Sequence, residues 1–371
     1  MNAGIIYISN ENEANLAKAK YLDTSLLNEL LKKLKNVSLD RIYLVGTETE
    51  DTTVISNNNL SEVIDDIDGH DGKTLLISPF YPLLKDYHFE ALLKEKGDGV
   101  VLSDDKELLK IYKFENSKIK KYESLSYKAF KVENGSVRKI NSLLELEEFS
   151  KEERIRINTK HINNGVNILD KEDTYISYET EIEKGVTVYP NVYMDGHCVI
   201  KNGAVITNGS YLINAKIGNN TLITNSRIDN SIVHNNVKIG PMAHLRMNSE
   251  VFDDVRIGNF VEFKKTKFGK GSKCAHLTYL GDTTVGENVN IGCGVVTVNY
   301  DGVNKFETVI DDHAFIGSNA NLIAPITVGK YAVVAAGSTC TEDVPDNDMA
   351  IARSRQTTMK DYGYKYIKKE K

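Results

Sequence analysis

Apolar residues recur at every sixth position through about half of this 371-residue sequence. With slips of about one residue, the spacing holds in the runs Ile176, Ile182, Val188, Met194, Ile200, Ile206; Ile239, Leu245, Val251, Ile257, Phe263; and Ile310, Ile316, Leu322, Val328, Val334. An α-helix repeats every 3.6 residues and a strand every two, so neither produces this spacing. A six-residue period is typical of a parallel β-helix, in which each face of a three-sided coil contributes one inward aliphatic side chain. No single coil buries its own apolar residues, so stability comes from stacked neighbours.

The first part of the sequence shows short apolar runs instead. We expect buried strands at residues 3–9, 41–46, 73–78 and 99–103, and amphipathic helices at 24–34 and 83–95. Alternating strands and helices favour an α/β domain with a mostly parallel, Rossmann-like sheet. The predicted organisation is an α/β domain at 1–148, a linking helix at 149–165, an all-β parallel β-helix at 166–353 and a C-terminal tail at 354–371.

The composition of the sequence limits which binding partners and which cellular compartment are expected. The net charge of −6 gives no electrostatic reason to expect nucleic acid as the main partner. The four cysteines (Cys198, Cys274, Cys293 and Cys340) form no C-x-x-C pair, which favours free thiols in a reducing compartment. We see no signal peptide and no apolar run long enough to span a bilayer. We therefore expect a cytoplasmic protein without membrane insertion.

One interruption of the six-residue spacing is a candidate binding loop. Thr297 and Ile310 are thirteen residues apart, and the inserted stretch from Asn299 to Phe306 includes Tyr300 and Lys305. A β-helix can eject such a segment from a corner, and loops on a rigid scaffold often carry binding residues. A tolerated insertion without function is the alternative.

His276 is the candidate general base, because an imidazole with a pKa near neutrality suits proton abstraction. A coil takes about eighteen residues, so stacking could bring His276 and Tyr279, Glu262 and Lys264, and the Asn299 loop to one edge. Cations beside the stack (Arg246, Lys264 and Lys305) are of the kind that binds phosphate. Taken singly, each is equally compatible with a structural or solvent-facing role. His234, His244 and His276 are spaced too irregularly for a zinc site, so we expect no metal.

Several segments resemble one family, the bifunctional glucosamine-1-phosphate acetyltransferase / N-acetylglucosamine-1-phosphate uridyltransferase enzymes (GlmU). The similar segments lie at residues 239–246, 258–265, 271–282, 289–294, 298–302 and 350–353, and the similarity runs from about Lys139 to Arg353. The resemblance implies a left-handed β-helix, a homotrimer with active sites between subunits, and an amino-sugar phosphate and acetyl-CoA as substrates.

The same resemblance implies a role for each matching residue. His276 would be the base that acts on the sugar amine, with Glu262 as a supporting partner. The sugar phosphate would be held by Arg246, Lys264, Tyr279, Asn290 and Lys305. The acetyl-CoA site would be lined by Cys293, Asn299, Tyr300, Ser318, Ala336 and Arg353, with Ser318 also placed to donate to the departing thiolate. The family commonly has alanine at the position of Cys293.

The N-terminal domain departs from the family pattern. The family has a glycine-rich, basic phosphate loop after the first strand, whereas residues 9–14 here contain no glycine and include Glu11 and Glu13. Phe80 falls where the family has a Mg²⁺-binding aspartate, and Asn141 alone would not hold the ion against its hydration shell. The domain is also shorter than the family's. We therefore expect a degenerate nucleotidyltransferase-like domain without Mg²⁺ and without uridyltransferase activity.

The leading hypothesis is a glucosamine-1-phosphate N-acetyltransferase that serves UDP-N-acetylglucosamine and cell-wall synthesis. The alternatives are an acetyltransferase for another amino sugar or amine, a fully bifunctional enzyme, and a non-catalytic trimeric partner of a separate nucleotidyltransferase.

Overall fold

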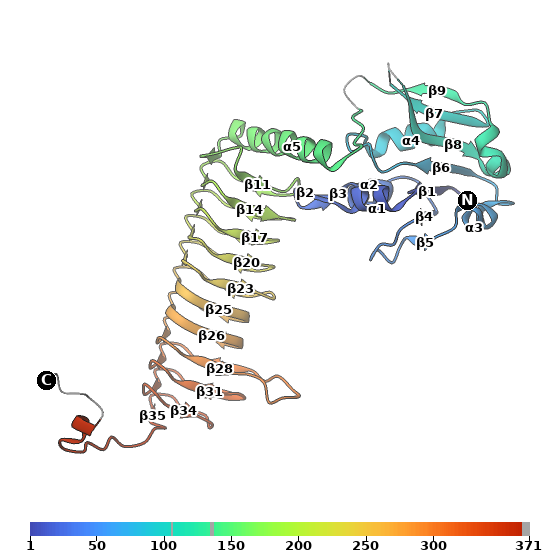
Figure 1. The fold of residues 1–371 in the computed structure, drawn as a ribbon. Coiled ribbons are helices and arrows are strands. Elements are labelled where there is room, and N and C mark those ends of the chain that lie inside the picture. Colours follow the sequence, from blue (N-terminus) through green and yellow to red (C-terminus); the bar gives the residue numbers. More distant parts are fainter. Residues whose placement is uncertain (105–106, 134–136, 366–371) are drawn as a thin grey trace. The chain divides into compact units, whose positions relative to one another are not determined.

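The structure, a computed structural model, describes residues 1–104, 107–133 and 137–365 (Figure 1). The chain forms two compact units, Met1–Glu153 and Arg154–Lys371. Among the described residues, none of the helices combines the length and the apolar character needed to cross a membrane. The predicted tail at 354–371 includes a short 3₁₀ helix, η2 (Tyr362–Lys365), and its last residues, 366–371, lie outside the described part.

The first unit is built on a seven-stranded sheet with the order β5-β4-β1-β6-β8-β7-β9. Strands β1, β4, β5 and β6 are parallel, and β8 runs antiparallel to both β6 and β7. The strand bounds are β1 (Ala3–Tyr7), β4 (Arg41–Val45), β5 (Ile55–Asn57), β6 (Lys73–Ile77), β7 (Gly99–Ser103), β8 (Leu108–Glu115) and β9 (Lys128–Lys131); β2 (Lys20–Tyr21) and β3 (Thr24–Ser25) form a separate hairpin. The helices are α1 (Glu11–Lys18), α2 (Leu26–Leu34), α3 (Leu60–Ile67), α4 (Asp86–Lys94) and the 3₁₀ helix η1 (Asn116–Ser124).

Helices cover both faces of this sheet. Successive side chains of a strand point to opposite faces, so strands that are apolar throughout have apolar side chains to bury on each face. In β1, Ala3 and Ile5 join the apolar cluster that includes α3 and η1, while Ile6 joins the cluster that includes α1, α2 and α4. The α/β class and the four predicted strands are confirmed. The prediction omitted α1, α3, η1, β2, β3, β5, β8 and β9.

Helix α5 (Leu143–Asn163) begins earlier in the chain than the predicted linking helix. The Ser142 hydroxyl accepts a hydrogen bond from the Glu145 backbone N–H (3.2 Å), which is the cap that starts the helix. Further along, Asn158 donates to the backbone carbonyls of Lys171 and Thr174, both at 2.8 Å. These bonds attach the C-terminal half of α5 to the first coil of the second unit.

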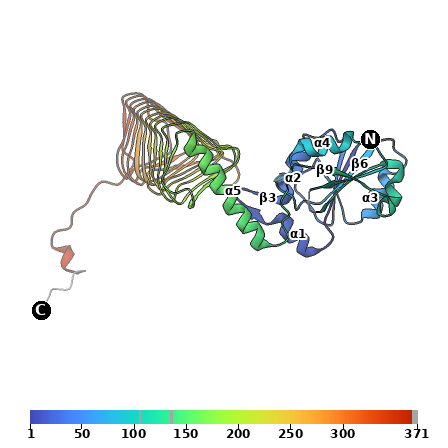
Figure 2. The ribbon, with the colours of Figure 1, turned by 90° about the horizontal axis from the view of Figure 1, so that it is seen from above.

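The second unit is a left-handed parallel β-helix, as predicted. Strands pair mainly with the strand three positions later, so the coils stack into three faces. Figure 1 shows the strands of one face from β11 to β34, and Figure 2 shows the triangular outline of the stack. The first face contains β10 (Asn167–Ile168), β13 (Thr187–Val188), β16 (Val205–Ile206), β19 (Leu222–Ile223), β22 (Lys238–Ile239), β27 (Asn290–Ile291), β30 (Phe315–Ile316), β33 (Val333–Val334) and β35 (Met349–Ala350). The second face contains β11 (Thr174–Ile176), β14 (Val192–Asp195), β17 (Tyr211–Ile213), β20 (Arg227–Asp229), β23 (His244–Arg246), β28 (Val296–Val298), β31 (Asn321–Ile323) and β34 (Thr339–Cys340). The third face contains β12 (Glu181–Ile182), β15 (Val199–Ile200), β18 (Lys216–Ile217), β21 (Ile232–Val233), β24 (Glu250–Val251), β29 (Thr308–Ile310) and β32 (Ile326–Val328).

Two strands, β25 (Arg256–Phe268) and β26 (Lys273–Val285), run through all three faces and carry four of the predicted site residues, Glu262, Lys264, His276 and Tyr279. In β25 the inward side chains are Ile257, Phe263 and Phe268, all buried, and the two phenylalanine rings pack with centroids 4.9 Å apart. The step from Phe263 to Phe268 is five residues rather than six. Three residues separate Arg246 from Glu250, but two separate their partners Lys264 and Lys267, so the corner between the second and third faces is one residue shorter here and the sequence spacing slips.

Candidate active site

We call the corner between the first and second faces the first edge, and the corner between the second and third faces the second edge. At the first edge, residues from consecutive coils stack in one column. Backbone bonds link its turns: Gly294 N–H to the His276 carbonyl (3.4 Å), Asn319 N–H to the Cys293 carbonyl (2.7 Å) and Gly337 N–H to the Ser318 carbonyl (2.8 Å).

The Arg353 guanidinium extends this column by donating to the Ala336 carbonyl at 2.8 Å. The structure therefore brings together His276, Cys293, Ser318, Ala336 and Arg353 along a single corner of the stack. All of them are exposed except Cys293, which is half-buried.

The side chain of His276 is held by a residue that the sequence did not single out. Its Nδ1 lies 3.0 Å from the Oδ1 atom of Asn259, which is paired with His276 across β25 and β26. An amide oxygen only accepts hydrogen bonds, so this contact assigns the ring proton to Nδ1. The lone pair of Nε2 is then oriented outward and can accept a proton.

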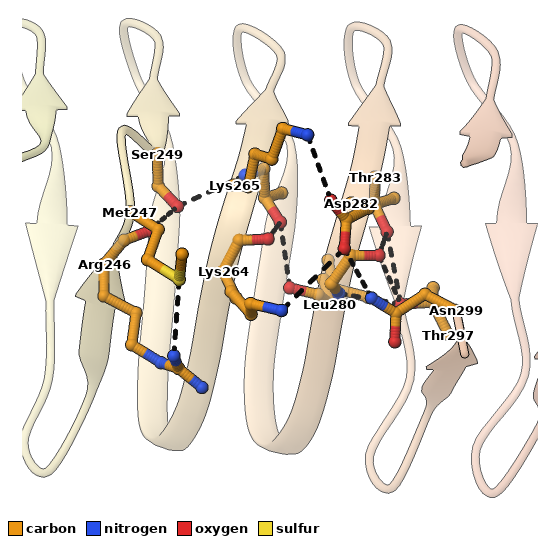
Figure 3. A network of polar contacts seen from close by, with 12 residues as sticks. Arg246, Met247, Ser249, Lys264, Lys265, Leu280, Asp282, Thr283, Thr297 and Asn299 are labelled. Carbon is orange, nitrogen blue, oxygen red and sulfur yellow. Dashed lines mark hydrogen bonds and ion pairs between the residues drawn. The ribbon is translucent and has the colours of Figure 1, made fainter. Parts of the chain in front are cut away.

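The second edge gathers cations and carboxylates, and Figure 3 shows Arg246, Lys264, Lys265 and Asp282 there. The Arg246 guanidinium donates to Glu262 Oε1 through Nε (2.8 Å) and Nη2 (2.6 Å). Two lysines contact Asp282, with Lys264 Nζ 4.0 Å from Oδ2 and Lys265 Nζ 3.4 Å from Oδ1. Register places Arg246 and Lys264 on adjacent coils at the same position of the second face.

The loop that interrupts the repeat leaves the stack at the second edge. Its ends are joined by a hydrogen bond from the Phe306 N–H to the Asn299 carbonyl (2.9 Å) and by a bridge between Tyr300 and Lys305. The Asn299 side chain is buried and donates to Asp282 Oδ2 at 2.6 Å. Tyr300 and Lys305 are exposed on the loop.

Two pKa shifts describe the electrostatics of this edge. The pKa of Lys264 is lowered, first by the neighbouring amino group of Lys305 and then by burial. Burial raises the pKa of Tyr279, and the nearby Glu262 adds to the effect. Two ammonium groups in contact repel each other, so an anion bound between Lys264 and Lys305 would be stabilised.

Within one chain, the predicted residues occupy two edges of the second face rather than one. Lys264 is in register with Gly281, which lies five residues beyond His276 on β26. At the rise of an extended strand this separates the two groups by about 16 Å. Tyr279 lies between them on the second face, and Asn290 lies on the first face, in register with Lys273.

Glu262, expected to support His276, contacts Arg246 instead, and the ring partner of His276 is Asn259. Asp282 is the other residue that the sequence prediction missed. Both missed residues could have been found by stepping seventeen positions along the chain: Asn259 precedes His276 by that interval, and Asp282 precedes Asn299 by the same interval.

The N-terminal unit offers a poor fit for Mg²⁺ at the positions that the resemblance suggests. Phe80 is 6% exposed and belongs to the apolar core, while the amide of Asn141 donates to the carboxylate of Glu145 at 3.1 Å. Within residues 1–104, 107–133 and 137–365, no group of three or more His, Cys, Asp or Glu side chains is arranged to hold a metal ion.

The turn after β1 is closed by its own side chains. The Glu13 carboxylate accepts hydrogen bonds from the Ser9 backbone N–H (2.9 Å) and hydroxyl (2.7 Å), and the Asn10 side chain accepts from the Glu13 N–H (3.0 Å). The first turn of α1 is therefore capped internally, at the place where a phosphate would otherwise bind.

The fold and the site define a class: a two-unit hexapeptide-repeat protein, in which an α/β unit precedes a left-handed β-helix with a histidine and a cationic group on its edges. No family model matches the chain. Several curated proteins are similar to the chain in sequence. The chain is 40% identical over 314 residues to the bifunctional protein GlmU of Exiguobacterium sibiricum, covering 82% of this chain and 68% of the relative. It is 52% identical over 223 residues to GlmU of Geobacillus sp. (strain WCH70), covering 60% and 49%.

The chain belongs to the GlmU family. It spans about half the length of several of the curated relatives that it matches. Among solved structures, LpxA from Acinetobacter baumannii aligns with 50% of this chain and 66% of its own, at 19% sequence identity and a TM-score of 0.24. That TM-score is too low to support an argument.

Proposed function

We propose that this protein transfers the acetyl group of acetyl-CoA to the amine of glucosamine 1-phosphate, forming N-acetylglucosamine 1-phosphate. The observation that carries the proposal is the pair of columns on the second face of the β-helix. One edge presents His276 above a row of small side chains, and the other presents Lys264 and Lys305 with the loop that begins at Asn299.

The first-edge column suits a long, extended thioester. From His276 through Cys293, Ser318 and Ala336 to Arg353 there are four steps between coils, or about 19 Å at the usual spacing of strands. The three middle side chains are small and leave room along the corner. Arg353 at the far end is a charged partner for the phosphates of coenzyme A.

The second-edge cations suit a sugar phosphate. Lys264 and Lys305 would bind the phosphate, with Arg246, Tyr279 and Asn290 contributing further contacts. Because Arg246 is already paired with Glu262, we assign the main electrostatic role to the two lysines.

The chemistry follows from the residue types. Glucosamine 1-phosphate carries an ammonium group, which becomes nucleophilic only after it loses a proton. His276 Nε2 takes that proton, the amine attacks the thioester carbonyl, and a tetrahedral oxyanion forms. A backbone N–H at Asn299 or Tyr300 would stabilise the oxyanion. As the intermediate collapses and the C–S bond breaks, the Ser318 hydroxyl would donate a hydrogen bond to the departing thiolate, which takes the remaining extra proton from the nitrogen. General-base help of this kind contributes about 10²–10⁴-fold.

The separation of the two columns supports a homotrimer. Groups about 16 Å apart on one face do not act on one bond, whereas the first edge of one chain set against the second edge of its neighbour would bring them together. A closed ring of three such contacts gives three equivalent sites between subunits. We propose this arrangement for a cytoplasmic protein that acts on small molecules, with neither nucleic acid nor membrane as a partner.

We further propose that the N-terminal domain at 1–148 has lost uridyltransferase activity and needs no Mg²⁺. The internally capped turn at Ser9–Glu13 and the buried Phe80 support this part of the proposal. The domain bounds, with a linker at 149–165 and the β-helix at 166–353, stay predictions.

A thiol-release assay with acetyl-CoA and glucosamine 1-phosphate tests the proposal. Release of coenzyme A with this acceptor supports it. Release only with another amino sugar or amine would favour the first alternative, and no release with any acceptor would favour a non-catalytic partner. Light scattering on the purified protein gives the mass of the assembly, and a monomer that is fully active would contradict the shared site.

A further inference from the structure

Asp282 occupies a corner of the β-helix where three polar side chains converge (Figure 3). Its two carboxylate oxygens have different partners. Oδ1 faces Lys265 (3.4 Å), while Oδ2 accepts from Asn299 Nδ2 (2.6 Å) and faces Lys264 (4.0 Å). The carboxylate therefore joins the coil above it to the coil below it.

The surroundings make the contacts of Asp282 with Lys264 and Asn299 stronger than those of an ordinary surface ion pair. The side chains of Asp282 and Lys264 are each 12% exposed, and Asn299 is 7% exposed. A pair so shielded from water is screened less than an exposed pair. Asp282 also lies in the left-handed region (φ 47°), where its backbone turns the corner and directs the carboxylate along the edge.

Two partners of Asp282, Lys264 and Asn299, belong to the parts of the site proposed to bind the two different substrates. Lys264 neighbours Lys305, and together they form the proposed phosphate site. Asn299 is the root of the 299–306 loop, whose ends meet in the hydrogen bond from Phe306 N–H to the Asn299 carbonyl (2.9 Å). Asp282 contacts both Lys264 and Asn299.

We propose that Asp282 is a positioning residue for the acetyl transfer, holding Lys264 and the root of the 299–306 loop in the arrangement that receives the two substrates. It acts through these neighbours and does not touch the reacting atoms. The inference rests on the proposed function, since it assigns a residue to that reaction.

The charges around Lys264 supply a readout that a purely structural role would not change. Lys305 and Arg246 lower the pKa of Lys264, whereas the negative charge of Asp282 raises it. Replacing the carboxylate with an amide removes the one influence among these three that favours the charged form. Lys264 then loses its proton at lower pH, so the alkaline limb of kcat/KM for glucosamine 1-phosphate shifts to lower pH.

The test variant is Asp282→Asn. Asparagine occupies other left-handed corners of the same β-helix, such as Asn214 (φ 46°) and Asn230 (φ 45°), so the substitution preserves the fold. We expect kcat/KM for glucosamine 1-phosphate to fall by about 10- to 100-fold, together with the shift of the alkaline limb, because small displacements of binding groups have effects of this size.

Asp254→Asn is a matched control. Asp254 is also left-handed (φ 62°), accepts from Asn236 Nδ2 (3.2 Å) and faces Lys270 Nζ (3.8 Å), but it lies at the corner between the third and first faces. We expect wild-type kinetics from this variant. Equal effects of the two substitutions, or wild-type kinetics and pH dependence in Asp282→Asn, would overturn the inference.

A second measurement needs no activity. Competitive labelling with acetic anhydride, analysed by mass spectrometry across pH, reports the apparent pKa of each lysine in the whole protein. Lys264 should become reactive at lower pH in Asp282→Asn than in the wild type, with Lys267 unchanged. If the wild type shows no acetyl transfer, the proposed function fails, while this labelling still decides whether Asp282 controls Lys264. Identical Lys264 labelling in both proteins would refute that control.

Discussion

The resemblance to GlmU leads one to expect a phosphate site in two regions of this chain. The two regions differ in whether the groups that would bind the phosphate already have partners within the protein. In the N-terminal unit, the turn after β1 satisfies its own donors: Glu13 accepts from Ser9, and Asn10 accepts from Glu13. At the second edge of the β-helix, Lys264 and Lys305 are neighbours with like charge, and Asp282 is 4.0 Å from Lys264. A helix end capped by its own chain gains stability, whereas two adjacent ammonium groups cost stability that a bound anion would restore.

The comparison extends to the side chains that would handle the reaction. Phe80 is packed in the core of the first unit, whereas His276 is exposed, with its ring oriented by Asn259. A nucleotidyltransferase needs ligands for a metal ion, and a buried phenyl ring provides none. Family membership covers both regions, so local chemistry is the better guide to which activity each one retains.

The largest expected contrast is between the two activities of the unaltered protein. With UTP, N-acetylglucosamine 1-phosphate and Mg²⁺, we expect no release of pyrophosphate above background, while acetyl-CoA and glucosamine 1-phosphate yield free coenzyme A in the same preparation. Formation of UDP-N-acetylglucosamine would contradict the proposed loss of uridyltransferase activity and favour a fully bifunctional enzyme.

The next largest effect is expected from His276→Ala. Loss of the general base should lower kcat by at least about 10²-fold, with the mass of the assembly unchanged in light scattering. His197→Ala is a suitable control, because His197 is also exposed on the β-helix, with its ring 3.0 Å from the Glu179 backbone carbonyl and 4.0 Å from the Glu181 carboxylate. Near-normal turnover in His276→Ala would exclude His276 from the mechanism.

A smaller effect is expected from Lys264→Ala. Hydrogen bonds to a charged group are worth about 1.5–3 kcal/mol, so KM for glucosamine 1-phosphate should rise by about 10- to 100-fold, with little change in KM for acetyl-CoA. Lys267→Ala is the comparison variant, since Lys267 is exposed on the third face of the same strand. An equal rise in both values of KM would argue against a phosphate site at the second edge.

The smallest effect concerns the capped turn. Asn10→Ala removes the acceptor for the Glu13 N–H (3.0 Å) and should lower the free energy of opening of α1 by about 1 kcal/mol, as measured by hydrogen exchange. Acetyl transfer should be unaffected. Asn59→Ala, which removes the corresponding acceptor for Ser61 N–H at α3 (2.9 Å), should loosen α3 and leave α1 unchanged.

The architecture of both units could be predicted from the sequence, because the patterns that indicate it are periodicities over a few neighbouring residues. The six-residue recurrence of residues such as Ile310, Ile316 and Leu322 follows from one inward side chain per face, and it predicts the β-helix without any long-range information. In the first unit, the apolar runs that became β1, β4, β6 and β7 are local in the same sense.

The contacts of the site required the folded chain, because they depend on the register between coils. Some coils advance by seventeen residues and others by eighteen: Asn259 meets His276 after seventeen, while Arg246 meets Lys264 after eighteen. Side chains alternate in and out along a strand, so an error of one residue exchanges a buried position for an exposed one. The five-residue step from Phe263 to Phe268 shortens the corner between the second and third faces while both side chains stay buried, and Asp282 meets Lys264 and Asn299 at this corner. Periodicity could therefore predict the faces, while the pairing of individual side chains at the corners depended on the accumulated register of the whole stack.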